Sequence, residues 1–170
     1  MIELSSSNSK FRTFGTRELE SLFKDPFLAI STDNSALELG MRFSVTVPGQ
    51  IVAIRYYKAP NDNAVHTGKI WSDSGTLLAS IIFLSNSSGS GWKESYLATP
   101  LIVAANTFYR VSVNAINGYP YAIQDFNFAI SRGHISAPIN AGTFNTTSGN
   151  FPNSSFNNSN YFRDIVFIPL

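Results

Sequence analysis

The residues of this sequence that are best suited to bind a ligand are two tyrosines in a predicted turn. Tyr119 and Tyr121 flank Pro120 in the segment NGYPYAI, whose turn-forming residues favour exposure. The apolar faces of sugar rings stack on exposed aromatic rings, while nearby amides and carboxylates bond the sugar hydroxyls. We therefore take Tyr119 and Tyr121 as candidate ligand-binding rings. Their candidate polar partners are Asn117, Asp125 and Asn160.

The other prominent aromatic residues are two tryptophans and two loop phenylalanines. Trp71 lies in GKIWSDSG, and Trp92 follows a flexible glycine turn. Either ring could stack on a ligand, but aromatic side chains dominate the cores of β-sandwiches. We expect Trp71 and Trp92 to be structural and largely buried, and Phe151 and Phe156 to be exposed.

Two predicted turns could bind a metal ion. Asp33 in STDNS and Asp62 in PNDNAVHTG lie among asparagines, and Ca²⁺ prefers such oxygen donors. Aspartate and asparagine also populate turns because their side chains bond the nearby backbone. A structural calcium ion at Asp33 or Asp62 is one interpretation, and ordinary turn residues are the other. No other cofactor is expected.

The sequence offers little that could catalyse a reaction. Its two histidines, His66 and His134, belong to no metal-binding motif, and the chain has no cysteine. It contains no nucleophile elbow, phosphate-binding loop or dinucleotide fingerprint. Two facing carboxylates could hydrolyse glycosides, but spacing in the sequence cannot reveal such a pair. We therefore expect that the protein is not an enzyme.

The last predicted strand, YFRDIVFI, contains two adjacent charges. Arg163 and Asp164 must point to opposite faces of the sheet. One interpretation places a charge at the sheet rim, and a second pairs Asp164 with Arg55 or Arg42. A third makes Asp164 a ligand-binding carboxylate.

The composition favours a β-protein and argues against nucleic-acid binding and against a membrane span. Hydrophobic residues make up 44% of the chain and charged residues only 14%, so serine, threonine and asparagine supply most of the polarity. The net charge is +1 without a basic cluster, which argues against nucleic-acid binding. No apolar run approaches the roughly 18 residues of a membrane-spanning helix, so we expect no membrane span.

From Phe27 onward, short runs of β-branched and aromatic residues alternate with turns. Turn signals about 8–12 residues apart are typical of antiparallel sandwiches. The predicted fold class is therefore all-β, an antiparallel, jelly-roll-like β-sandwich over residues 27–170. We expect a turn at Thr99-Pro100 and a long connection over residues 131–160.

Residues 1–26 differ in composition and form a predicted N-terminal extension or linker, helical or irregular. Within it, TRELESLFKDP predicts a short helix that Thr16 caps and Pro26 ends. The alternative is an arm that docks on a neighbouring subunit, which would give a homo-oligomer. In that case the protein is a structural or adhesive subunit that assembles through its sheet edges and this arm.

Four blocks of the sequence, taken in order, resemble a bacterial family of domains of unknown function. They are LELGMRFSVTVPGQIVAIRYYK, HTGKIWSDSGTLLAS, GWKESYLATPLIVAANTFYRVSVNAINGYPYA and FPNSSFNNSNYFRDIVF. The resemblance runs from about Leu37 to Phe167, and the chain before Asp33 lies outside it. Arg163 stands where the family tends to be apolar, and Phe162 where it often has tryptophan.

Members of this family look like β-sandwich modules of large secreted and cell-surface proteins, often beside glycoside hydrolase, immunoglobulin-like and fibronectin-like domains. The resemblance implies a secreted or cell-surface location and a non-catalytic role. The first 27 residues have no uncharged apolar core, so we expect no signal peptide within them. With the candidate tyrosines, the resemblance leads us to expect a module that binds a polysaccharide or a cell-surface glycan.

Overall fold

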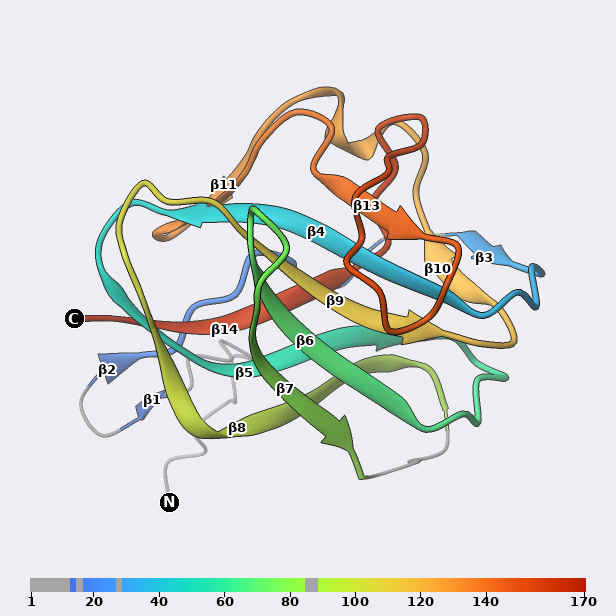
Figure 1. Cartoon of the computed structure of the whole chain (residues 1–170), viewed down its shortest axis with the longest axis horizontal. Helices are drawn as coiled ribbons and strands as arrows, with labels where there is room; N and C mark the ends of the chain where they lie inside the picture. The colour runs from blue at the N-terminus through green and yellow to red at the C-terminus, as the bar shows by residue number, and fades with distance from the viewer. Residues whose placement is uncertain (1–12, 15–16, 27–28, 85–88) are drawn as a thin grey trace, which may run out of the picture.

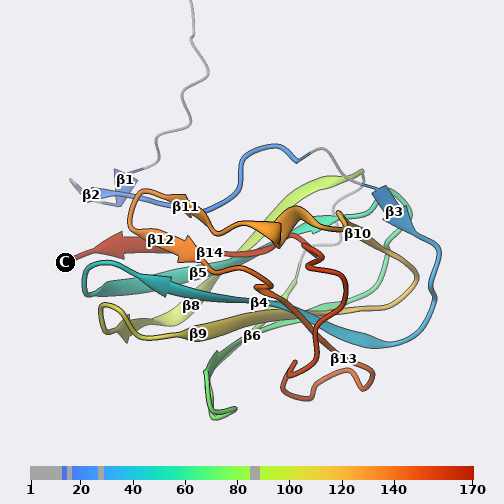
Figure 2. The same cartoon turned by 90° about the horizontal axis from the view of Figure 1, so that it is seen from above.

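The computed structural model describes residues 13–14, 17–26, 29–84 and 89–170. Over these residues the chain is an all-β protein whose antiparallel strands form a two-layered sandwich, which confirms the predicted fold class (Figures 1 and 2). Residues 1–12 and 15–16 of the predicted N-terminal arm lie outside the described residues. In the described part of the chain, no helix has the length and apolar character needed to cross a membrane.

The elements follow the turn signals of the sequence. Their bounds are β1 Thr13–Phe14, β2 Arg17–Glu18, β3 Ala29–Ser31, β4 Leu37–Val45, β5 Gly49–Lys58, β6 His66–Ser72, β7 Leu77–Phe83, β8 Gly91–Val103, β9 Tyr109–Ala115, β10 Tyr119–Tyr121, β11 Ile130–Arg132, β12 Ile135–Ala137, β13 Gly142–Asn145 and β14 Arg163–Pro169. A short 3-10 turn, η1, covers Asp125–Asn127.

Six long strands form an antiparallel ribbon that is folded over on itself. β6 pairs with β7, β5 with β8, and β4 with β9. The fold of the ribbon places β4, β9, β6 and β7 in the larger sheet, and β5 and β8 in the smaller one. β14 then pairs with β5 and completes the smaller sheet. This wrapping of paired strands is that of a jelly roll.

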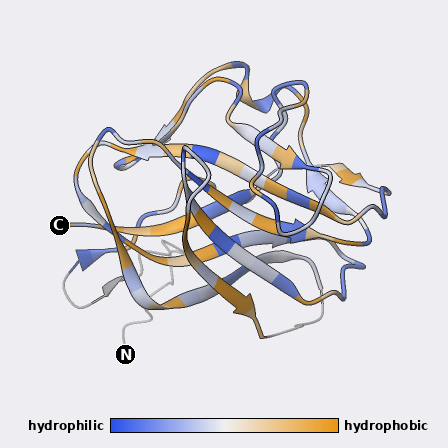
Figure 3. Cartoon of the chain, in the orientation of Figure 1, coloured by the Kyte–Doolittle hydropathy of each residue, from blue (hydrophilic) through white to orange (hydrophobic). Residues whose placement is uncertain are grey.

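Alternating side chains of the two sheets meet in the core. On β4, Met41 and Phe43 point inward and are at most 1% exposed. Ile54 of β5 and Ile165 and Phe167 of β14 belong to the same buried cluster and are fully enclosed. Such positions recur every second residue because strand side chains alternate between faces. Figure 3 shows the resulting alternation of hydrophobic and hydrophilic residues along β4.

β8 continues through the predicted turn at Thr99-Pro100, so that prediction was wrong. Ile51 of β5 pairs with Leu101, and Ala53 pairs with Tyr96, which leaves residues 97–100 of β8 opposite Val52 alone. A bulge of this kind tolerates a proline, because the unpaired residues need not donate to the ladder. β8 is moreover an edge strand, with a neighbour on one side only.

The N-terminal segment 17–26 is extended rather than helical, so the predicted helix was wrong. Glu20 pairs through its backbone with Phe167, at the free edge of β14. The amides of Leu22 and Phe23 donate to the carboxylate of Asp164, at 3.2 and 3.0 Å. These tertiary partners replace the bonds a helix would supply, and they outweigh the weak local propensity. The segment therefore lies against the edge of β14.

The predicted long connection over residues 131–160 lies against the larger sheet. It carries β12 and β13, which both pair with β4. Past β13, the amide of Gly149 donates to Glu38 Oε2 at 2.8 Å, and Arg110 Nη1 donates to the carbonyl of Pro152 at 2.5 Å. Glu38 is fully buried as a result. The connection therefore covers part of the outward face of β4 and β9.

Candidate functional site

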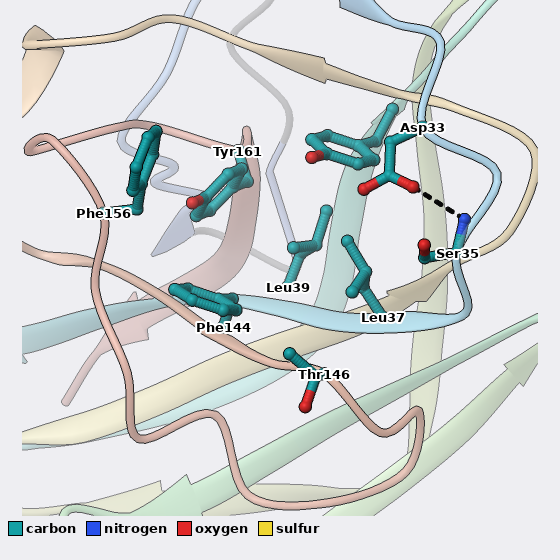
Figure 4. A pocket seen from close by; sticks show the side chains of 9 residues that line it. Asp33, Ser35, Leu37, Leu39, Phe144, Thr146, Phe156 and Tyr161 are labelled. Atoms are coloured by element: carbon teal, nitrogen blue, oxygen red, sulfur yellow. Dashed lines mark hydrogen bonds between the residues drawn. The ribbon is translucent and has the colours of Figure 1, made fainter.

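An aromatic groove lies where β3, β10, β13 and the start of β4 meet (Figure 4). It consists of two adjoining hollows of about 340 and 230 Å³. The aromatic rings that line it are Tyr119, Tyr121, Phe144, Phe156 and Tyr161. Small polar side chains and aliphatic residues complete the lining. They are Ser31, Asp33, Ser35, Leu37, Leu39, Ile123, Thr146 and Ser159.

The two candidate tyrosines owe their position to the pairing of β10 with β3. Tyr119 lies opposite Ser31 and Tyr121 opposite Ala29. Because side chains two residues apart in a strand point the same way, both rings face one side, with the buried Pro120 between them. Their ring centres are 6.2 Å apart in an edge-to-face arrangement. Both rings are half-buried, so each keeps an exposed surface.

Tyr161 forms the floor of the groove beside Tyr119. Their ring centres are 6.0 Å apart, and Tyr161 is 6% exposed. Burial raises the pKa of Tyr161 to about 12. Its hydroxyl is therefore protonated at neutral pH. The residue is held in place by the backbone of its neighbour Asn160, which bridges to Ala122.

Phe144 and Phe156 line the groove from the long connection. Phe144 is half-buried on β13, and its backbone bridges to Ser154. Phe156 is 57% exposed, as expected from its loop position. Figure 4 shows the rings of Phe144, Phe156 and Tyr161 gathered along one side of the groove. An exposed aromatic ring that lines a hollow gives a ligand an apolar surface to stack on.

Asp33 carries the charge of the groove. It is exposed in the connection before β4, and its Oδ1 accepts the amide of Ser35 at 2.8 Å (Figure 4). This hydrogen bond lowers the pKa of Asp33 below its ordinary range. Asp33 is accordingly ionised at neutral pH and can accept hydrogen bonds from a ligand. Of the described residues that line the two hollows, Asp33 is the one with an ionisable acid or base other than tyrosine.

The predicted polar partners do not line the groove. Asn117 is exposed in the turn before β10, where its backbone φ of 68° is left-handed. Asn160 is 1% exposed, and its amide donates to Asp125 Oδ2 at 2.8 Å. Its own side-chain oxygen accepts the amide of Phe162. Asn160 and Asp125 thus bond each other, and Asn160 acts on the groove only by fixing the backbone beside Tyr161.

Sequence reasoning missed Tyr161 and Phe144 as site residues. Tyr161 opens the last predicted strand and Phe144 lies in a long connection, so neither stands out locally. They reach the groove through pairing with distant segments, namely β13 with β4 and Asn160 with Ala122. The one available signal was the aromatic content of the region around Phe156.

The two candidate calcium ligands lie in different surroundings. Asp33 lines the groove, whereas Asp62 is buried in the turn between β5 and β6. Asp62 Oδ2 lies 2.8 Å from His66 Nε2, and its Oδ1 accepts the amide of Ala64 at 3.1 Å. Across the described ranges, no three histidine or acidic side chains come together in a way that could hold a metal ion. A structural calcium ion stays a prediction.

The two tryptophans make structural contacts. Trp71 is 6% exposed, and its indole N–H donates to Ser112 Oγ at 2.9 Å. Trp92 is half-buried rather than largely buried, and its N–H donates to the carbonyl of Lys24 at 2.9 Å. Its ring stacks on Phe23, with the centres 6.3 Å apart. Trp92 therefore helps to fix the N-terminal segment to the sandwich. Phe151, which we expected to be exposed, is half-buried with its ring against Trp71.

The adjacent charges of β14 are both buried. Asp164 pairs with Arg55, which confirms the second of the three interpretations and leaves Asp164 inaccessible to a ligand. Arg163 points into the core between the sheets, 2% exposed, and its Nη1 donates to the carbonyl of Tyr161 at 2.6 Å. Burial lowers the pKa of Arg163 to about 10.

The sequence of this sandwich matches a recognised family of domains. The model of the family described as Domain of unknown function (DUF4082) matches residues 24–163, so the chain belongs to this family. The match begins earlier than the resemblance noted above, at Lys24, and includes the end of the N-terminal segment. A comparison with curated proteins found no match.

Proposed function

We propose that this chain is a non-catalytic carbohydrate-binding module and that the aromatic groove is its binding site. The observation that carries the proposal is the set of exposed and half-exposed rings of Tyr119, Tyr121 and Phe156 around two connected hollows. Sugar rings present apolar faces that stack on such rings, and the larger hollow has a volume typical of ligand pockets, about 300 Å³ or more.

The polar groups of the groove suit sugar hydroxyls. Asp33 offers carboxylate oxygens as acceptors, while Ser35 and Thr146 offer hydroxyls that donate and accept. Sugar hydroxyls both donate and accept, so this mixed set can satisfy them. The aromatic rings supply area and the polar groups fix orientation.

The charge content of the groove supports binding rather than hydrolysis. Glycoside hydrolases generally use two carboxyl groups that flank the scissile bond. Among the described residues that line the groove, Asp33 is the single carboxylate. We therefore propose a module that holds a glycan for other domains. A secreted or cell-surface location in an exported bacterial protein is part of this proposal, because such sites meet polysaccharides there.

The test is a binding screen with two matched variants. The chain is applied at high concentration to an array of polysaccharides, and hits are measured by calorimetry. We expect micromolar to millimolar affinity, about −4 to −8 kcal/mol, as for a shallow site with few contacts. Phe156→Ala should weaken binding at least tenfold. Phe128→Ala is the control, because Phe128 is also an exposed phenylalanine, 79% exposed, that does not line the groove.

Two outcomes would reject the proposal. The first is an array that is silent for every neutral, acidic and amino polysaccharide. The second is a hit that Phe156→Ala, Tyr119→Ala and Phe128→Ala leave equally strong, which would place the binding surface elsewhere.

A structural or adhesive subunit is the second candidate function. It is favoured by β7, the last strand of the larger sheet, which carries the exposed side chains of Leu78 and Ile82. Exposed apolar edge strands invite pairing with another chain. Light scattering decides between the candidates. A larger species that Ile82→Lys converts to a monomer supports assembly through this edge, and a monomer at all concentrations contradicts it.

A further inference from the structure

The two hollows of the groove adjoin, which bears on the length of its ligand. They share Tyr119, Phe156 and Tyr161 and differ in their other residues. The first extends from these rings toward Asp33 and Phe144, and the second toward Tyr121. A single sugar would fill one hollow and leave the rings of the other in water. A chain of two or more sugars would cover both.

The electrostatics of the groove bear on the charge of its ligand. Asp33 is exposed at the surface of the groove and is ionised at neutral pH, and its hydrogen bond with Ser35 lowers its pKa further. No lysine, arginine or histidine is among the described residues that line either hollow. An anionic sugar would therefore meet a negative charge without a cationic partner.

The nearest buried cation does not change this balance. Arg163 lies behind the floor of the groove and donates to the carbonyl of Tyr161. It is enclosed, so it cannot contact a ligand. Its charge is also felt by the buried carboxylates Asp62 and Glu38, which offset its field. Asp33 thus remains the one charged side chain among the described residues that line the groove.

We infer that the groove selects uncharged glycan chains of at least two sugar units and discriminates against uronic-acid chains. The inference rests on the proposed function, because it names the ligand class of the same groove. Stacking on Tyr119, Tyr121 and Phe156 gives affinity for chains, and Asp33 supplies the discrimination by charge.

The length of the ligand is tested with oligosaccharides of the best-binding polysaccharide. Calorimetry compares its monosaccharide, disaccharide and tetrasaccharide. The expected result is a tetrasaccharide that binds at least tenfold more tightly than the monosaccharide. Tyr121→Ala removes a ring that lines the second hollow and not the first, so it should reduce that ratio. Equal affinity for all three lengths would overturn the inference.

The charge of the ligand is tested with two probes that share one sugar chain and differ in charge and in the ester methyl groups. The Asp33→Asn variant separates the effect of the charge from that of the methyl groups. Tetragalacturonate and its methyl ester have the same chain, and one is anionic while the other is uncharged. Each competes against the best-binding polysaccharide. Repulsion between two like charges at contact distance in a hydrated site weakens binding about fivefold. We expect the methyl ester to compete at least fivefold better, and the difference to shrink in Asp33→Asn and at high salt. Asp25→Asn, at an exposed position away from the groove, is the control.

The outcomes separate this inference from the function on which it rests. If the strongest ligand on the array is a uronic-acid or sulfated polysaccharide, or if tetragalacturonate competes as well as its ester, the inference fails and the binding function stands. If no glycan binds, the proposed function fails and this inference falls with it.

Discussion

Arg55 and Asp164 form a buried ion pair across the β5–β14 ladder, where they are directly opposite in register. Arg55 Nη2 lies 2.7 Å from Asp164 Oδ2, and Nε of the same arginine lies 2.9 Å from that oxygen. Arg55 Nη2 also donates to the carbonyl of Phe23, while Asp164 accepts the amides of Leu22 and Phe23. The pair therefore joins the N-terminal segment to the smaller sheet.

Removing one partner of this pair should strongly destabilise the protein. Asp164→Ala removes a buried acceptor from Arg55 and from the backbone amides of Leu22, Phe23 and Ile165. We therefore expect a loss of about 3–5 kcal/mol in the free energy of unfolding. Urea titration followed by tryptophan fluorescence measures it. Asp25→Ala, at an exposed site, should change stability by less than about 0.5 kcal/mol. A loss below about 1 kcal/mol for Asp164→Ala would contradict the structural role of the pair.

The N-terminal segment should behave as part of the sandwich. Leu22 and Phe23 are 3% and 9% exposed within the main core cluster, so truncation of either leaves a cavity. We expect Phe23→Ala to cost about 3–5 kcal/mol, and a chain beginning at residue 27 to lose more. A chain beginning at Arg17 keeps the contacts of Leu22 and Phe23 and is the control. Equal thermal stability of the chains beginning at 17 and at 27 would show that the segment is a dispensable linker.

Asp73 should make stability depend on acid pH. Hydrogen bonds from Arg42, and less strongly from Arg110, lower the pKa of Asp73, against the opposing effect of burial. A carboxyl whose pKa is lower in the folded state than in the unfolded state stabilises the fold above its unfolded pKa, about 3.9. That contribution is lost as the pH falls below about 4. Unfolding curves between pH 6 and about 2.5 should therefore converge for the wild type and Asp73→Asn. Parallel curves over that range would be evidence against this contribution of Asp73 to stability.

The strands of the body could be predicted because their signal is local. The run from Ile51 to Lys58 combines β-branched and aromatic residues between two turns, and it became β5. The segment around Leu22 could not be predicted in the same way. Its apolar spacing fits one face of a helix, but the carboxylate of Asp164, far along the chain, provides the amides with other partners. Local propensity is weaker than such tertiary contacts.

The same distinction applies to the groove. Tyr119 and Tyr121 could be identified because turn residues surround them and the proline between them sets the spacing. Asn160 was a reasonable polar partner by its chemistry, yet it is buried and bonded to Asp125. Tyr161 and Phe144 enter the groove through strand pairing across the fold, which no local pattern encodes.

The folded-over ribbon also fixes an order in which the chain can assemble. β6 and β7 are joined by a tight turn, whereas β5 and β8, and then β4 and β9, are separated by progressively longer stretches of chain. Closing a longer loop costs more entropy, and pairings between distant segments form slowly. Folding should thus spread from the β6–β7 hairpin toward β4 and β9. The groove needs Leu37 and Leu39 of β4 together with Tyr119 and Tyr161, so a refolding chain acquires its binding surface in the closing steps.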